Sequence, residues 1–511
     1  MDILQPIARD TLKGLTKTQL LTLFEGEQDL RLQLESQVSK LQARYDEQTE
    51  QILNIEGKYV RLKKRIFCPS SEKLPRDKKS KKKQTKPKPR KKTPKLPSER
   101  YPNLPIEEVE LELEQNPDCP TCGKDMASTN MSEMSETLTV TPKKYHITRQ
   151  YRKKYRCTCC HGSLVTTPAP PRIIPRSSYS DEMIIDVALS KFCDLTPIDR
   201  YSAMANRTSD VNLPPNSLIS LTHKLADFLE PIYSEGLKGE IIEAEVISAD
   251  ETTHRMLEGD EKKNWYLWGF STSEAAYFEY HDTRSSDAVS EILQLSKANT
   301  ILSDAYTGYA KAIKLVNDKR SKDNIPSIKS ALCNAHSRRK FDEASKFEES
   351  DFYMRQYRRI YQVERIAKYK PNCKARARKI SGKIFKRMKD RSNIDLERVS
   401  SHSDLARAIN YFQNNYEGLT LHIKHLDIPI DNNRQESLFR SPVIGRKVWF
   451  GTHSERGART SAILFSLVES CKMIKINPRK YFNDMVSMIH EKKSWMTPSQ
   501  YKSKSLEAED K

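Results

Sequence analysis

The sequence of 511 residues contains no hydrophobic run long enough to span a bilayer. Its first two residues, Met1 and Asp2, do not begin a signal peptide. We therefore expect a soluble, cytoplasmic protein with no membrane partner. Without a secretory signal, the 10 cysteines argue for thiols and a metal site and against disulfides.

Acidic residues are also scarce relative to basic ones, and the net charge is +20. Residues 73–100 hold 14 Lys and Arg against 2 Asp and Glu, and residues 355–391 hold 15 against 2. The rest of the chain is therefore slightly acidic, and the basicity lies in two segments. Such segments favour a polyanion, which predicts DNA as partner and a nucleoid-associated location. The alternative is two solvated, soluble segments.

No proline interrupts the N-terminal heptad pattern, and its glycines, Gly26 and Gly57, lie outside the core positions, so the pattern predicts a coiled-coil helix over residues 16–67. Eleven of its fourteen core positions are apolar, and a homo-oligomer would follow. Arg31, Glu27 and Gln48 weaken the seam, so one long helix packed on its own chain is the alternative. The core positions are Phe24, Arg31, Val38, Tyr45, Ile52, Tyr59 and Ile66, alternating with Leu20, Glu27, Leu34, Leu41, Gln48, Ile55 and Leu62.

Residues 68–104 combine cations with repeated prolines, which predicts an extended, disordered basic linker. A small zinc-ribbon domain is expected at residues 105–165. Its ligands would be two C-x-x-C pairs, Cys119 with Cys122 and Cys157 with Cys160. A closed site of four cysteines would make this Zn²⁺ structural. Cys159 and His161 are rival ligands, and free or redox-active cysteines are the alternative.

Helices separated by turns are expected at residues 177–240. The segment Thr196 to Ala205 and a second helix from Ser217 to Leu229 have the proportions of a helix-turn-helix. A plain helical bundle that supports a catalytic domain explains the pattern equally well.

Acidic residues follow two short apolar segments of the central region. Ala244 to Ala249 predicts a first strand followed by Asp250, and Thr300 to Ser303 a fourth strand followed by Asp304. Between them lie two more strands, Trp265 to Phe270 and Ala275 to Tyr280, and a helix whose apolar stripe is Val289, Ile292 and Leu293. Such a crossover returns the chain parallel to an earlier strand. If the fourth strand pairs with the first, both aspartates could hold one divalent cation such as Mg²⁺.

A third acid, Glu436, would lie about one turn into a helix that Asp431 or Asn432 caps. Each acid alone is more simply a turn or cap residue, and only the set of three favours a metal site. Arg434, Arg440, Arg446 and Lys447 cluster near Glu436 in the sequence and suit phosphate binding, with surface ion pairs as the alternative.

The 131 residues between Asp304 and Glu436 exceed what the sheet needs. After a fifth strand at Ser327 to Cys333, the cations Arg338 and Arg339 open a helical, basic insertion at about residues 340–417, which we expect to contact DNA. Cys333 and His336 suggest a second zinc site, but only two ligands are in view. We therefore expect a packed Cys and a phosphate-facing His.

Several motifs together resemble the DDE transposases of the IS66 type. They are ADET at Ala249 to Thr252, SDAYTGY at Ser303 to Tyr309, CNAHSRRKF at Cys333 to Phe341, and IDNNRQE with GRKVWF between Ile430 and Phe450. FCPSSEKL at Phe67 to Leu74 extends the resemblance toward the N-terminus. Cys68 and Ser437 depart from the family pattern, which usually has Gly and Arg there.

The resemblance implies an α/β fold with an RNase H-like catalytic core, a mixed five-stranded sheet with helices, at residues 241–490. It implies that Asp250, Asp304 and Glu436 are catalytic and bind Mg²⁺ or Mn²⁺. We thus predict a transposase that binds the terminal inverted repeats of an insertion sequence, cleaves DNA and joins it to target DNA. Accessory proteins of the same element are possible partners. The alternatives are a non-catalytic DNA-binding protein derived from a transposase and a nuclease of the same fold.

Residues 491–511 are expected to be disordered.

Overall fold

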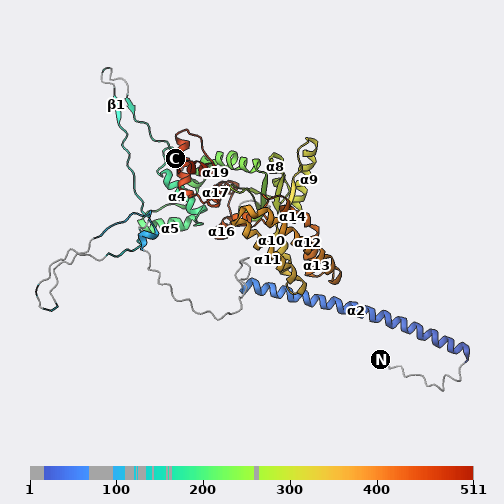
Figure 1. Cartoon of the computed structure of the whole chain (residues 1–511). Coiled ribbons are helices and arrows are strands. Elements are labelled where there is room, and N and C mark those ends of the chain that lie inside the picture. The colour runs from blue at the N-terminus through green and yellow to red at the C-terminus, as the bar shows by residue number, and fades with distance from the viewer. Residues whose placement is uncertain are drawn as a thin grey trace. The chain divides into compact units, whose positions relative to one another are not determined.

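The computed structural model describes residues 16–67, 96–109, 120–121, 124, 134–140, 143–156, 159, 164–257 and 264–509. By its internal contacts the chain divides into two units, and Figure 1 traces it from blue at the N-terminus to red at the C-terminus. The first comprises Met1–Pro69, Tyr151–Met204 and Asn212–Lys511, and the second Ser70–Gln150 with Ala205–Val211. Of the described helices, none is both long enough and apolar enough to cross a bilayer.

A mixed five-stranded sheet forms the centre of the first unit, in the order β5-β4-β3-β6-β7. The strands are β3 (Val246–Arg255), β4 (Asn264–Ser271), β5 (Ala276–His281), β6 (Thr300–Ser303) and β7 (Lys329–Leu332). The first three are antiparallel neighbours, and β6 pairs in parallel with both β3 and β7. The predicted meander, crossover helix and parallel return are therefore present.

The first strand is longer than the sequence predicted. We expected it to end before Asp250, but β3 continues to Arg255. The reason is its neighbour β4, whose residues pair with β3 along its whole second half, down to Arg255 opposite Asn264. Asp250 therefore lies within a strand and not in the turn that follows one.

Helices cover both edges of the sheet, which would otherwise expose unpaired backbone groups. Along β5 lies α17 (Glu455–Met473), where the Ser466 and Ser470 hydroxyls accept hydrogen bonds of 2.9 Å from the amides of Phe278 and Ala276. At the other edge α14 (Tyr416–Lys424) packs on β7. A Cβ at its Gly418 would lie 2.8 Å from Leu332, so the close packing requires glycine.

The crossover between β5 and β6 is α8 (Asp287–Leu295), which buries the predicted stripe of Val289, Ile292 and Leu293. The helix α9 (Thr307–Lys322) follows β6. Preceding the sheet are α4 (Asp181–Phe192), α5 (Ile198–Ser209), α6 (Pro215–Pro231), η1 (Ile232–Leu237) and α7 (Lys238–Glu243). The apolar face of α6 is buried, through Leu218, Leu221, Leu225 and Leu229.

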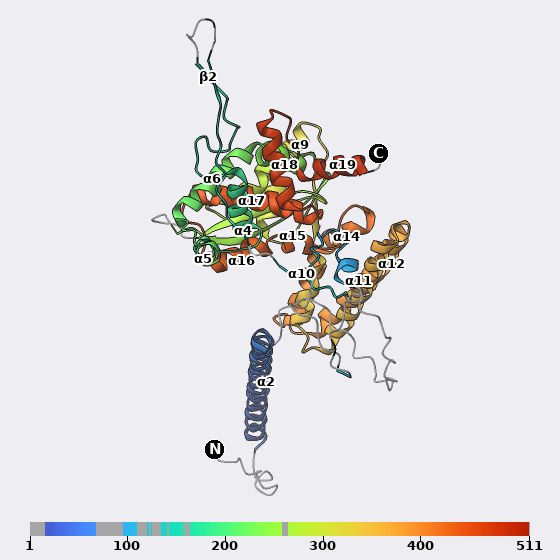
Figure 2. The ribbon, with the colours of Figure 1, turned by 90° about the vertical axis from the view of Figure 1, so that its left-hand side faces the viewer.

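In the sequence, a group of helices lies between β7 and α15, the helix that carries Glu436, and α10, α11 and α12 are seen together in Figure 2. They are α10 (Asn334–Glu343), α11 (Glu348–Tyr369), η2 (Pro371–Cys373), α12 (Lys374–Arg398), α13 (Asp404–Asn414) and α14. These helices share an aromatic core of their own, in which Phe341 stacks on Tyr353 with ring centroids 4.3 Å apart. The helices α15 (Asn433–Leu438), α16 (Arg440–Trp449), α17 and α18 (Pro478–His490) follow.

The prediction of a disordered C-terminal tail is wrong for most of its length, because residues Pro498–Glu509 form the helix α19. This helix is held by polar contacts that could not be predicted from the sequence. The Thr497 amide donates to the Gln500 side chain at 3.0 Å, and the Tyr501 hydroxyl donates to Asp484 of α18 at 2.5 Å.

The N-terminal helix α2 spans Lys17–Phe67, and Phe24, Leu34, Val38 and Leu41 are exposed on it. The strands β1 (Lys154–Arg156) and β2 (Leu164–Thr166) form an antiparallel pair. In the second unit, the short helix α3 (Pro97–Arg100) is tied to Glu136 by the Ser98 amide and hydroxyl, both at 2.8 Å. The predicted zinc ligands Cys119, Cys122, Cys157 and Cys160, and most of the basic linker, lie outside the described residues.

Gly269 of β4 provides a test of how α15, and Phe439 just after it, rest on the sheet. A Cβ there would lie 2.4 Å from Gln435 Nε2, 2.7 Å from Phe439 and 3.0 Å from Phe278. We expect Gly269→Ala to lower the free energy of unfolding by about 1–3 kcal/mol, because buried groups must shift. Urea unfolding measures this change.

The matched control is Gly239→Ala in α7, where a Cβ would meet nothing within 4 Å. Because alanine favours helix over glycine, this variant should be at least as stable as the natural protein. Equal effects of the two substitutions would contradict the packing described for Gly269.

Candidate active site

The parallel pairing of β3 with β6 brings the two predicted aspartates together. Ser248 lies opposite Leu302 in the register of the two strands. Continuing this register by two residues brings Asp250 level with Asp304, which follows the end of β6. Asp304 Oδ1 accepts a hydrogen bond of 3.0 Å from the Tyr306 amide, which fixes the carboxylate at the turn into α9.

The face of the sheet that carries Asp250 is also the face on which α15 packs. Asp250 and Gly269 are cross-strand partners, so their side-chain positions share a face. Gln435 and Phe439 approach Gly269 from α15 and its end. The helix start is anchored as well, since Asn432 Nδ2 donates to the Ala249 carbonyl at 2.9 Å. Asn432 thus joins α15 to the residue before Asp250.

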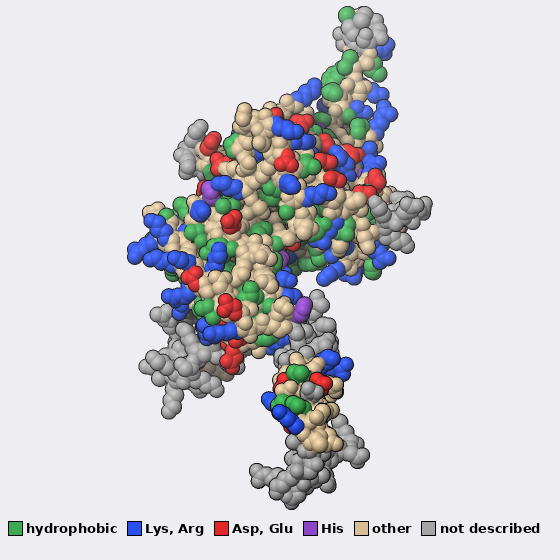
Figure 3. Space-filling model, turned by 90° about the vertical axis from the view of Figure 1, so that its right-hand side faces the viewer, with side chains coloured by type: hydrophobic (Ala, Val, Ile, Leu, Met, Phe, Trp, Pro, Cys, Tyr) green, Lys and Arg blue, Asp and Glu red, His purple; other side chains and the backbone are tan. Residues whose placement is uncertain are grey.

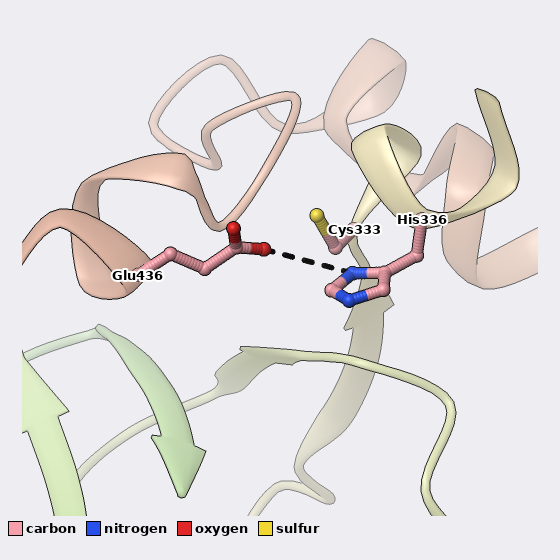
Figure 4. Close-up of side chains that lie close together, drawn as sticks. All are labelled: Cys333, His336 and Glu436. Carbon is pink, nitrogen blue, oxygen red and sulfur yellow. Dashed lines mark ion pairs between the residues drawn. The ribbon is translucent and has the colours of Figure 1, made fainter. Parts of the chain in front are cut away.

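Glu436 lies in the first turn of α15, as the sequence predicted. Its carboxylate turns toward α10, where Oε1 lies 3.9 Å from His336 Nδ1 and Oε2 lies 4.0 Å from an Arg339 nitrogen (Figure 4). The capping assignment holds only in part. Asn432 occupies the N-cap position without a side-chain cap, and Asp431 Oδ1 accepts from the Asn433 amide at 3.3 Å.

The three carboxylates are close enough to influence one another. Burial raises the pKa of Asp250 to about 8, and the negative charges of Glu251, Asp304 and Glu436 contribute to this rise. A carboxylate with several like charges nearby favours a proton or a cation. Because hard divalent ions such as Mg²⁺ prefer oxygen ligands, Asp250 and Asp304 are candidate metal ligands.

A second group of donors shares Glu436. One ligand atom each from Cys333, His336 and Glu436 lies within 4.8 Å of the others (Figure 4). Sequence reasoning found only two of these ligands, because Glu436 is about 100 residues farther along the chain. Cys333 Sγ accepts a hydrogen bond of 3.2 Å from the Asn432 amide, and burial raises the pKa of its thiol to about 12. Its described contacts are those of a packed, protonated thiol.

The six predicted DNA-binding cations do not gather at one point. Arg434 reaches the Ser273 carbonyl at 2.5 Å, Arg446 approaches Thr253 Oγ1 at 3.3 Å, and Arg339 lies beside Glu436. Arg440 and Lys447 lie on α16, and Arg338 is half-buried on α10. They spread around the site and along β3.

Sequence reasoning missed a group of residues behind the aspartates. Glu251 is only 3% exposed in its side chain and bonds to Arg284 and to the Tyr309 hydroxyl. Arg284 in turn lies over the ring of Tyr306. The sequence could have indicated this group only through position. Glu251 directly follows Asp250, and Tyr306 and Tyr309 lie in the motif that contains Asp304.

A mixed five-stranded sheet with acids from three distant segments near one face defines an α/β protein with a candidate metal-dependent site. A profile of the Transposase IS66 family matches residues 176–460, which is more than half of the chain. The chain therefore belongs to the IS66 transposase family, as the sequence motifs indicated. This membership supports a transposase-related, DNA-processing function.

Three relatives from Sinorhizobium fredii (strain NBRC 101917 / NGR234) are similar over most of their length. The uncharacterized protein y4hP is 23% identical over 411 residues, covering 75% of this chain and 72% of the relative. The uncharacterized protein y4jD is 26% identical, covering 70% and 71%, and the uncharacterized protein y4qI is 27% identical, covering 75% and 72%. All three are described only as uncharacterized.

The raised pKa of Asp250 predicts a pH dependence of stability without added divalent metal. The unfolded chain loses this proton near pH 3.8, whereas the folded protein keeps it to about pH 8. The folded state thus binds more protons in this window, so stability falls as pH rises through it. Asparagine carries no charge at any pH. We expect Asp250→Asn to be more stable than the natural protein at pH 8 by roughly 1–3 kcal/mol.

Urea unfolding at pH values on both sides of this window measures the difference, which should shrink toward acid pH. Asp323→Asn at the exposed end of α9 is the control and should leave the pH dependence unchanged. An unchanged pH profile in Asp250→Asn would show that Asp250 is ionised in the folded protein at neutral pH.

Proposed function

We propose that this chain is a DDE transposase that cleaves the ends of an insertion sequence and joins them to target DNA. The observation that carries the proposal is the meeting of Asp250, Asp304 and the helix of Glu436 near one face of the sheet, in a chain of this family. The sheet order supports an RNase H-like core.

The three carboxylates would hold Mg²⁺ or Mn²⁺. When bound, such ions activate a water or a 3′-hydroxyl for in-line attack at phosphorus and stabilise the charge that develops there. The residues supply oxygen ligands and orientation. Glu436 would turn from His336 and Arg339 toward the aspartates, while Asn432 keeps the start of α15 against β3.

The insertion offers a surface for the DNA backbone. Its helices α11 and α12 pack together and carry exposed Lys and Arg side chains, and such side chains are spread over the face shown in Figure 3. The exposed cations of this segment are Arg355, Arg359, Arg365, Lys368, Lys370, Arg376, Lys379, Lys383, Lys386, Arg387 and Lys389. Contacts to phosphate here would position DNA without reading its sequence.

We further propose the remaining modules on the strength of their sequence. The pairs Cys119 with Cys122 and Cys157 with Cys160 would hold a structural Zn²⁺ in a ribbon at residues 105–165. The basic linker at 68–104 and the helices at 177–240 would add contacts to the element ends. Accessory proteins of the same element and a nucleoid-associated location fit this activity.

The test of catalysis is strand cleavage with Mg²⁺ on duplexes that copy the DNA flanking the gene. Asp250→Asn and Asp304→Asn should each abolish cleavage and joining, because each removes a charged metal ligand, while binding in gel shifts persists. Asp323→Asn, with an exposed acid at the end of α9, should keep full activity.

Retained cleavage in either active-site variant would refute the assignment of the acids. Cleavage without joining by the natural protein would favour a nuclease of this fold. DNA binding with no cleavage under any divalent ion would favour a non-catalytic DNA-binding protein.

Self-association through α2 is testable with two leucines of similar exposure. Leu34 is 53% exposed and occupies the heptad seam, whereas Leu32 is 64% exposed and lies outside it. We expect Leu34→Asp to convert an oligomer into a monomer, because a charge in the seam opposes coiled-coil packing. Leu32→Asp should leave the oligomer intact. Light scattering after size exclusion measures both masses, and a natural protein that is monomeric would contradict the coiled coil.

A further inference from the structure

Arg284 lies in the turn between β5 and α8, in contact with Glu251 and with Tyr306 of the motif that contains Asp304. Its Nε donates to Glu251 Oε1 at 2.9 Å, and one terminal nitrogen donates to the same oxygen at 2.5 Å. Glu251 directly follows Asp250 on β3. Burial lowers the pKa of Arg284, but its hydrogen bond to Glu251 and the charge of that acid raise the pKa above its ordinary value, and the charge of Asp304 adds to the rise.

Glu251 explains why Arg284 is held so firmly. Its side chain is only 3% exposed, and a buried carboxylate is costly unless it is paired and hydrogen-bonded. Arg284 supplies the charge, and the Tyr309 hydroxyl donates to Oε2 at 2.5 Å. One edge of the guanidinium is therefore fixed by a buried acid.

Tyr306 fixes the plane of the same group. The guanidinium carbon lies 3.9 Å from the centroid of the Tyr306 ring, and the Tyr306 hydroxyl donates to the Arg284 carbonyl at 3.1 Å. The Tyr306 amide in turn donates to Asp304 at 3.0 Å. The same residue thus orients Arg284 and the second aspartate.

The opposite edge of the guanidinium is available for a ligand. The Arg284 side chain is 44% exposed, and its remaining N–H groups make no hydrogen bond to any residue that the structure describes. A planar fork, already oriented and half in solvent, matches the oxygen atoms of a phosphate and loses little freedom on binding it.

We propose that Arg284 binds a backbone phosphate of the DNA strand that enters the candidate active site. Glu251 and Tyr306 hold the guanidinium in position for this contact. The proposal rests on the proposed function, because it assumes DNA at the aspartates. It adds a residue to the cations expected from the sequence, and it gives the buried Glu251 beside Asp250 a role.

If Arg284 had only a structural role, it would neutralise Glu251 and make no contact with DNA. The salt dependence of DNA binding distinguishes this role from the proposed phosphate contact. Each phosphate contact contributes roughly 0.9 to the slope of log affinity against log salt concentration. We expect Arg284→Gln to lower that slope by about one and to weaken binding roughly tenfold. Arg284→Lys should keep the slope but lose affinity, because an ammonium lacks the planar fork.

The probe is a fluorescein-labelled duplex copying the DNA that flanks the gene, and anisotropy is measured without added divalent metal. Arg479→Gln is the matched control. Arg479 of α18 is 50% exposed and pairs at 2.6 Å with Asp186, whose side chain is 14% exposed. Its replacement should leave the salt slope unchanged.

The double variant Glu251→Gln with Arg284→Gln removes the buried charge together with its partner, so it serves if Arg284→Gln alone fails to fold. The same loss of slope in this variant supports the proposal. A slope equal to that of the natural protein in the folded variants overturns it and leaves Arg284 a structural ion pair. Absence of cleavage by the natural protein, with the slope still lowered in Arg284→Gln, would refute the proposed function and not this contact.

Discussion

The parallel pairing of β3 with β6 is the contact on which the candidate site depends. It fixes Asp250 level with the start of the turn that holds Asp304, although 53 residues separate them. The cost is electrostatic, because Asp250 is partly buried beside other acids and its pKa rises to about 8. The two strands also bury apolar side chains, among them Ile247, Ala249, Ile301 and Leu302. A divalent cation would remove the repulsion that the fold builds in.

The third acid reaches the sheet through the packing of the inserted helices. Arg378 of α12 is buried and donates to the carbonyls of His422 and Ile428, while Asn334 of α10 donates to those of Leu419 and Ile430. These bonds tie the insertion to the segment that leads into α15. That segment also bonds to β3 through Asn432. A movement of the insertion would therefore shift α15 and, with it, Glu436. DNA on the proposed surface of α11 and α12 would therefore act on the helix that carries Glu436, the proposed third metal ligand.

Local patterns predicted the order of strands and the crossover, because short apolar runs and the stripe of α8 are readable without tertiary contacts. They could not give the true end of β3, which depends on pairing with β4. The helix α19 was missed for a related reason, since it is held by Tyr501 and Thr497 and not by a strong apolar face. The meeting of Cys333 and His336 with Glu436 is a product of the folded chain and leaves no local signal.

Adjacent acids on one strand can serve different purposes because successive side chains point to opposite faces. Asp250 lies on the face where α15 packs, whereas Glu251 points to the side of α9 and meets the Tyr309 hydroxyl. A buried carboxylate at position 251 would be a poor choice for stability alone, since an apolar residue could fill the space at lower cost. Its presence is understandable if its value lies in Arg284, which it holds oriented at the edge of the site. Glu251, on the face of β3 opposite to Asp250, would then contribute to the proposed DNA binding by orienting Arg284.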